Sequence, residues 1–185
     1  MSEFPDHPFW DFSLDVYMSE GVGSACLELQ DAHELDVNII LFCLWLGASG
    51  RGTLTAERMA KVTGAVAEWH GDVVRALRAV RVGMRGGVGG APADLNESLR
   101  QRIQKTEIDC EHTEQLMLAR SVDDLNAQED RAGADRLTDA ASNVSLYLEA
   151  FREVSDSDRK NLGLILKVAF RDLPLDRVEA AARSI

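Results

Sequence analysis

The sequence predicts an all-α protein: a single-domain irregular helical bundle of about seven or eight helices around one buried apolar helix. Apolar residues recur in steps of three and four along most of the chain, which is the helical period. No stretch shows strands alternating with helices, and only four Pro occur in 185 residues. Hydrophobic residues make up 45% of the chain, which is typical of a globular protein with a real core.

The buried helix is predicted at residues 36–47, where the segment VNIILFCLWL is apolar almost throughout. A bilayer span needs about 20 apolar residues, so this run of roughly ten is too short for a membrane anchor. Asp36 precedes the run and is a typical N-cap, while Gly47 supplies a stop. A helix that is apolar all round is expected to be surrounded by other helices.

The remaining segments follow from the same periodicity. Acidic N-terminal helices are expected within residues 8–48. A long helix over 55–84 is either continuous or broken near Gly71. A Gly-rich linker at 85–93 then leads to the C-terminal helices of 94–184, which are predicted at 94–123, 137–154, 158–171 and 174–184.

Charge and cysteine usage bound the function class. The net charge is −11, and residues 1–50 hold nine acids and no Lys or Arg, whereas residues 51–91 carry an excess of bases. An acidic chain repels nucleic acid and anionic lipid, so nucleic acid binding is disfavoured and no membrane association is expected. Three widely spaced Cys fit a reducing cytoplasm.

Three stretches, FWDFSLDVY, CLELQDAHELDVNIILFCLWL and WHGDVVRALRAVR, lie within the first 85 residues. They resemble a family of small proteobacterial proteins of unknown function with the signatures FWDFSLxVY and LQDxHxLDVNxxLFCLWL. The resemblance implies a bacterial, cytoplasmic, helical protein. It implies no activity and no catalytic residues.

Polar residues inside the first two motifs form the first candidate site. If the first three helices pack together, their polar side chains converge at one rim, where a His beside carboxylates acts as a base or a metal ligand. Structural roles, such as capping by Asp36, are the competing interpretation. The candidate rim consists of Ser13, Asp31, His33, Asp36 and Asn38.

A second cluster of metal-ligand residue types lies within the helix predicted at 94–123. A di-metal centre of the ferritin type needs Glu-x-x-His on two helices, and this chain has a single Asp-x-x-His without a second copy. The pattern favours a solvated acidic face, and no stoichiometric metal or other cofactor is expected. The residues concerned are Glu107, Asp109, Glu111, His112 and Glu114.

Two further patterns carry chemistry. Cys26 and His33 share a helix face, but a nucleophilic Cys needs an electropositive setting, so a core thiol is favoured. Basic residues also follow one edge of the long helix, where they pair with the acidic N-terminal helices or bind an anion or an acidic partner. These are Arg75, Arg78, Arg81 and Arg85.

No catalytic spacing stands out, which favours a non-enzymatic cytoplasmic interaction or adaptor protein with a protein partner or self-association through helical surfaces. The alternative is a small-molecule- or metal-dependent activity at the rim of Ser13, Asp31, His33, Asp36 and Asn38. A deep pocket that contains His33 favours the second hypothesis, whereas a filled core with an exposed apolar stripe favours the first.

Overall fold

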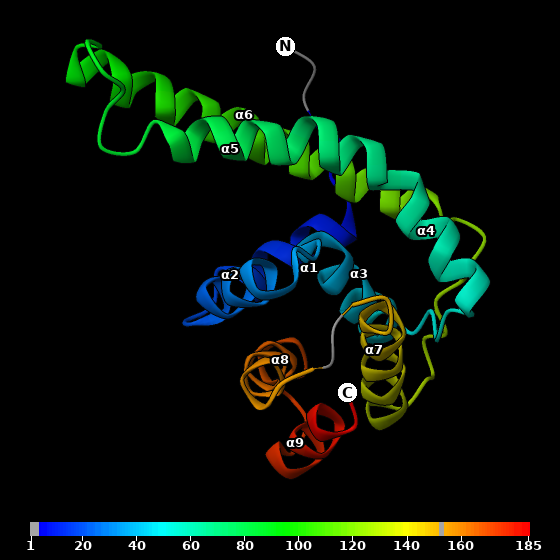
Figure 1. The fold of residues 1–185 in the computed structure, drawn as a ribbon. Coiled ribbons are helices and arrows are strands. Elements are labelled where there is room, and N and C mark those ends of the chain that lie inside the picture. The colour runs from blue at the N-terminus through cyan, green and yellow to red at the C-terminus, as the bar shows by residue number, and fades with distance from the viewer. Residues whose placement is uncertain (1–3, 152–153) are drawn as a thin grey trace.

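The computed structural model describes residues 4–151 and 154–185, and within them it confirms an all-helical fold without strands. Figure 1 shows the helices as a bundle from which one helical pair projects. The elements are α1 (Pro8–Tyr17), α2 (Val22–His33), α3 (Val37–Ala48), α4 (Ala56–Trp69), the π-helix η1 (His70–Val74), α5 (Arg75–Gly83), α6 (Ala93–Arg120), α7 (Gly133–Leu148), α8 (Asp156–Ala169) and α9 (Leu175–Arg183).

Helix α3 is the centre of the bundle, as its sequence predicts. Every residue from Asn38 to Gly47 is buried, and the Asp36 carboxylate caps the helix by accepting the Asn38 N–H at 2.8 Å. Its far end packs against α7 so closely that a Cβ on Gly47 would lie 2.5 Å from the Ala140 backbone nitrogen. Only Gly permits this approach of two helix backbones.

The long helix predicted over 55–84 is interrupted near Gly71, where η1 separates α4 from α5. Figure 1 shows that the chain bends at this point. Beyond the bend, α5 and the first half of α6 lie side by side as an antiparallel pair joined by the Gly-rich turn. We call this projecting pair the arm.

The C-terminal helices close the other side of the bundle. Helix α8 packs on α2 and α9, and it begins with a capping box in which Ser155 and Asp158 exchange hydrogen bonds. Helix α7 ends at Leu148, earlier than the sequence pattern predicts. Residues 152 and 153 of that predicted helix lie outside the described residues.

Apolar side chains from α1, α2, α3, α4, α6, α7, α8 and α9 meet in one hydrophobic cluster around α3. Within the described ranges, none of the helices is long and apolar enough to cross a bilayer. The arm differs from this core, because α5 contributes no buried residue and the inner face of α6 is polar.

Candidate functional site

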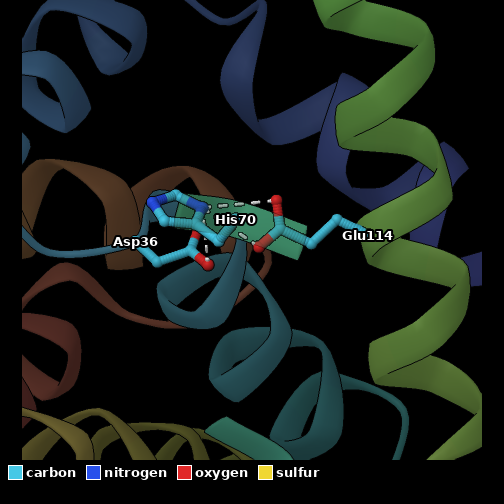
Figure 2. Close-up of side chains that lie close together, drawn as sticks. All are labelled: Asp36, His70 and Glu114. Atoms are coloured by element: carbon cyan, nitrogen blue, oxygen red, sulfur yellow. Dashed lines mark hydrogen bonds and ion pairs between the residues drawn. The ribbon is translucent and has the colours of Figure 1, made fainter. Parts of the chain in front are cut away.

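Three potential metal ligands from distant parts of the sequence meet beside the N-terminus of α3. Asp36 caps α3, His70 opens η1, and Glu114 lies on α6. Their ligand atoms all lie within 4.8 Å of one another, and Figure 2 shows the His70 ring pointing at both carboxylates. His70 Nδ1 is 3.1 Å from Glu114 Oε1 and 3.2 Å from Asp36 Oδ2.

The capping role of Asp36 uses one of its two carboxylate oxygens. Oδ1 accepts the Asn38 N–H, whereas the buried Oδ2 atom has no hydrogen-bond partner among the described residues. Oδ2 is the oxygen that faces His70, but the geometry between the two is not that of a hydrogen bond. A buried carboxylate oxygen without a donor is costly unless a cation or a proton satisfies it.

The π-helical turn positions His70. A π-turn adds one residue to a helical turn, and such turns occur frequently at functional sites. Here η1 begins at His70 and its ring lies mostly buried between α3 and α6. Figure 1 shows that α4 and α5 diverge at this interruption, and because η1 begins at His70, that residue lies at the bend of the chain.

Neighbouring polar groups hold the two carboxylates in place. Asn38 Nδ2 donates to Glu114 Oε2 at 3.1 Å, and Gln115 Nε2 donates to Asn38 Oδ1 at 2.8 Å. The Asp36 backbone N–H donates to the Tyr147 hydroxyl at 2.9 Å. Such outer hydrogen bonds orient the ligands of metal sites and keep their geometry fixed.

Burial disfavours charge on all three groups when no cation is present. It raises the pKa of Asp36 well above its usual value, and the neighbouring Glu114 carboxyl adds to the effect. Burial also raises the pKa of Glu114 and lowers the pKa of His70. Because Glu114 is completely shielded from solvent and Asp36 is buried, a divalent cation at this point would compensate two carboxylates that water screens poorly.

The predicted rim is only partly assembled. Ser13, Asp36 and Asn38 line one cavity, whereas Asp31 lies at the surface in a different depression. His33 does not join the other rim residues, because its Nε2 atom is hydrogen-bonded to Asp158 Oδ2 on α8 at 2.9 Å. The sequence shows no sign of that pair, since its partners are 125 positions apart.

The cavity that Ser13, Asp36 and Asn38 line encloses about 330 Å³ between α1, α2, α3, α5 and α6. Its volume is at the lower end of the range for small-molecule sites. We call it the α1–α6 cavity. Asp36 belongs both to its wall and to the ligand cluster, and Asn38 in the same wall donates to the ligand Glu114.

The interpretation of the acidic stretch of α6 as a solvated face is wrong for most of its residues. Glu107, His112 and Glu114 are buried, and Asp109 and Glu111 are partly buried. His112 is stacked on the Trp10 ring at 4.0 Å, with the Phe4 ring at 5.0 Å, and is not one of the three clustered ligands. Only Glu114 of this stretch joins the cluster, because it faces α3 and η1.

The arginine stripe forms ion pairs within the chain, but its acids come chiefly from α6 rather than from the N-terminal segment. Arg78 Nε donates to Glu107 at 2.9 Å, and Arg81 Nη2 donates to the same carboxylate at 3.0 Å. Arg75 alone reaches an acid of the N-terminal segment, Glu34, at 3.2 Å. Antiparallel packing of α5 on α6 explains this choice of partners.

At the end of α5, Arg85 is exposed. Cys26 lies on the buried face of α2, and burial raises the pKa of its thiol to about 12, which is the property of a core thiol rather than of a nucleophile. His33 points to Asp158 instead, so Cys26 and His33 show no pairing.

Sequence reasoning missed His70, Gln115 and Tyr147. His70 stands next to Gly71, where the sequence allows a break in the long helix, and a His at a helix interruption is the one signal that points to it. Gln115 and Tyr147 carry no such signal, because their roles depend on partners 77 and 111 positions away.

Comparison with known proteins gives one family. The model described as "Protein of unknown function (DUF2390)" matches residues 8–118, which is more than half of the chain and includes all three clustered ligands. No curated protein matches this chain, and no solved structure matches it.

Proposed function

We propose that this chain, which belongs to that family of unknown function, binds a divalent first-row transition-metal ion at Asp36, His70 and Glu114. The observation that carries the proposal is the unpartnered Asp36 Oδ2 atom, which is buried and aimed at the other two ligands. This choice develops the metal-dependent alternative that the sequence left open and replaces the expectation of no metal.

The spacing of the ligand atoms supports a shared ion. Metal–ligand bonds of about 2.0–2.2 Å place neighbouring ligand atoms roughly 3.3 Å apart around a tetrahedral ion. The separations from His70 Nδ1 to Glu114 Oε1 and to Asp36 Oδ2 are 3.1 and 3.2 Å. One imidazole and two carboxylates suit Zn²⁺ or Mn²⁺, and three protein ligands leave a coordination position for water or a small molecule.

Metal titration of the purified, chelator-treated protein tests the proposal. We expect about one Zn²⁺ or Mn²⁺ per chain by calorimetry and elemental analysis. Glu114→Gln and His70→Gln keep the size of each side chain, and each is expected to weaken binding by at least about 100-fold because one of three ligands is lost. The absence of saturable binding to the native protein would overturn the proposal.

His112→Gln is the matched control. His112 is also buried on α6, but it lies against Trp10 and Phe4 and outside the ligand cluster. Its replacement is expected to leave the metal affinity unchanged. A variant that loses helical content by circular dichroism does not test ligation. Asp36→Asn therefore serves as a further ligand variant, because it removes one charged ligand while its amide oxygen can still cap α3.

A second candidate function is the interaction or adaptor role through helical surfaces. The exposed apolar side chains Leu95 and Leu99 lie one helical turn apart near the tip of the arm, and Val88 in the preceding turn is exposed as well. The proposal also includes a bacterial and cytoplasmic setting, which the quoted motifs and the spacing of the three Cys support.

Sedimentation at increasing protein concentration tests self-association through the arm. Leu95→Ser combined with Leu99→Ser is expected to keep the protein monomeric where the native chain associates. A native protein that remains monomeric at all concentrations, and whose behaviour the double variant does not alter, removes self-association from this candidate function.

A further inference from the structure

The α1–α6 cavity contains two buried polar atoms that the protein itself leaves without partners. Ser13 and Gln115 both line the cavity and are only 2% and 4% exposed. Neither Ser13 Oγ nor Gln115 Oε1 has a hydrogen-bond partner among the described residues. Buried polar groups are almost always satisfied, so two orphaned atoms in the wall of one cavity point to a ligand.

The hydrogen-bond network fixes what Gln115 still needs. Asn38 Nδ2 donates to the Glu114 carboxylate, so Asn38 presents its oxygen to Gln115, and Gln115 must donate its N–H group to that oxygen. The atom left over on Gln115 is therefore a carbonyl oxygen, which only accepts. Its partner must carry an N–H or O–H donor, whereas the Ser13 hydroxyl can either donate or accept.

The two arginines that line the cavity are already paired within the protein. Arg78 is bound by Glu107, Glu111 and Gln30, and Arg81 is bound by Glu107. A guanidinium that is held by carboxylates offers little attraction to an anionic ligand. The site therefore favours a molecule without net charge.

The outer part of the cavity is apolar and unfilled. Trp10 contributes an aromatic wall, and four aliphatic side chains at the mouth keep a large exposed area although they are strongly apolar. These are Leu14, Met18, Leu27 and Ile108. A ligand that covers them removes apolar surface from water, which is the usual driving force for binding in such a pocket.

We infer that the α1–α6 cavity binds a small neutral molecule that has an apolar body and a polar end with an N–H or O–H donor. The donor end meets Gln115 and Ser13, and the apolar body lies against Trp10 and the exposed aliphatic side chains. This inference does not rest on the proposed metal, because neither Ser13 nor Trp10 belongs to the ligand cluster.

Three probes of one size and different polarity test the inference: benzamide, benzoate and toluene. Each is titrated into metal-free, ¹⁵N-labelled full-length protein, and the signals of the Trp10 indole N–H and the Gln115 side-chain amide are followed by NMR. Benzamide is expected to shift both signals saturably at roughly millimolar concentration, and to bind about tenfold more tightly than either other probe. Use of metal-free protein makes the result independent of the metal titration.

Ser13→Ala removes one of the two orphaned atoms and is expected to weaken benzamide binding about three- to tenfold. Ser142→Ala, on the exposed face of α7, is the matched control and should not change it. Tighter binding of benzoate, equal affinity for Ser13→Ala and the native chain, or no shift of either signal with any probe would each overturn the inference. A high-resolution crystal structure that shows only water bound to Ser13 and Gln115 in the presence of benzamide would do the same.

Discussion

Helix α3 and the middle of helix α6 both lie inside the molecule, but they are buried by different means. Residues 38–47 of α3 are apolar except for Asn38 and pack against α7 and α1. The stretch of α6 from Glu107 to Gln115 buries two carboxylates, an imidazole and an amide. The first region is stabilised by the removal of apolar area from water, and the second by specific polar partners.

The difference shows which kind of burial can be predicted from a sequence. Apolar burial is encoded locally, because neighbouring residues of the same helix are all apolar. The buried acids of α6 are satisfied by side chains between 26 and 76 positions away, namely those of α5, η1 and α3. A run of acids therefore looks solvated until those distant partners are known.

The largest expected effect is the loss of a central aromatic side chain from α3. Phe42 is completely buried and touches the rings of Phe9 and Trp45. Phe42→Ala is expected to lower the free energy of unfolding by about 3–5 kcal/mol, because it leaves a cavity in a packed core. Urea unfolding measures this loss.

Leu99→Ala on α6 is the matched control for Phe42→Ala. Leu99 is half-exposed on the arm, so its truncation is expected to change the stability by no more than about 0.5 kcal/mol. Equal losses for the two variants would show that α3 is no better packed than the arm.

The alkylation rates of two cysteines compare the burial of α3 and α6 without any substitution. Burial raises the pKa of Cys43 on α3 and also that of Cys110 on α6, where Asp109 and Glu111 add to the shift. Cys110 is partly exposed and Cys43 is not. We expect a neutral alkylating reagent at pH 8 to modify Cys110 at least about 100-fold faster, because Cys43 reacts only after the protein opens.

The pH dependence sharpens this expectation. A raised pKa means that the Cys110 thiolate forms at higher pH, so its alkylation rate is expected to go on increasing above pH 8.5, the approximate pKa of a free thiol. Peptide mass spectrometry after timed quenching measures both rates. Comparable labelling of Cys43 and Cys110 in the folded protein contradicts the predicted difference in burial.

Much of the fold follows from the sequence because the apolar pattern is local. The buried helix is predicted at 36–47 and observed at Val37–Ala48 with the predicted cap, and the break near Gly71 is observed as η1. Helix α6 begins one residue before its predicted start, and Asp94 and Glu97 do not form a capping box there, since α6 has no side-chain cap. Glu97 binds Arg100 and Gln101 instead.

The candidate site follows from the sequence only in part. Ser13, Asp36 and Asn38 converge because they lie on helices that pack through their predicted apolar faces. His33 turns to α8, a contact that depends on how the C-terminal half folds back. His70 joins Asp36 only because a π-turn bends the chain, and helical periodicity alone does not predict that bend.

The polar burial of α6 is tested by Glu107→Gln. Glu107 is bound by both Arg78 and Arg81, and its loss of charge leaves Arg78 with Glu111 alone and removes the carboxylate that binds the shielded Arg81. We expect a loss of about 2 kcal/mol, less than for a completely buried pair because both arginines keep some exposure. Glu97→Gln, which removes an exposed pair with Arg100, is the control and should have a much smaller effect.

The pH dependence of Glu107→Gln has a definite sign. Burial alone would raise the pKa of Glu107, but the hydrogen bonds from Arg81 and Arg78 outweigh it and hold that pKa below its usual value. A depressed folded-state pKa contributes stability above the unfolded pKa of about 4.3, and this contribution is lost as the pH falls through the folded value. The difference between native and variant is therefore expected to shrink below about pH 4. A difference that grows on acidification contradicts the assigned pairing.

The smallest expected effect belongs to Arg75, the member of the arginine stripe that reaches the N-terminal segment. Its side chain is 53% exposed and that of its partner Glu34 is 78% exposed, so water screens the attraction between them. Arg75→Ala is expected to cost no more than about 0–1 kcal/mol, and added salt should abolish the loss. Arg78→Ala is the matched comparison on the same helix, because Arg78 contacts Glu107 and Glu111 in a shielded setting and should cost more, with weaker salt dependence. Urea unfolding at low and high ionic strength separates the two variants. Equal losses of unfolding free energy for the two variants at both salt concentrations would show that shielding by α6 does not set the strength of these ion pairs. Burial of α6 by specific polar partners, which is one side of the comparison with α3, would then be contradicted.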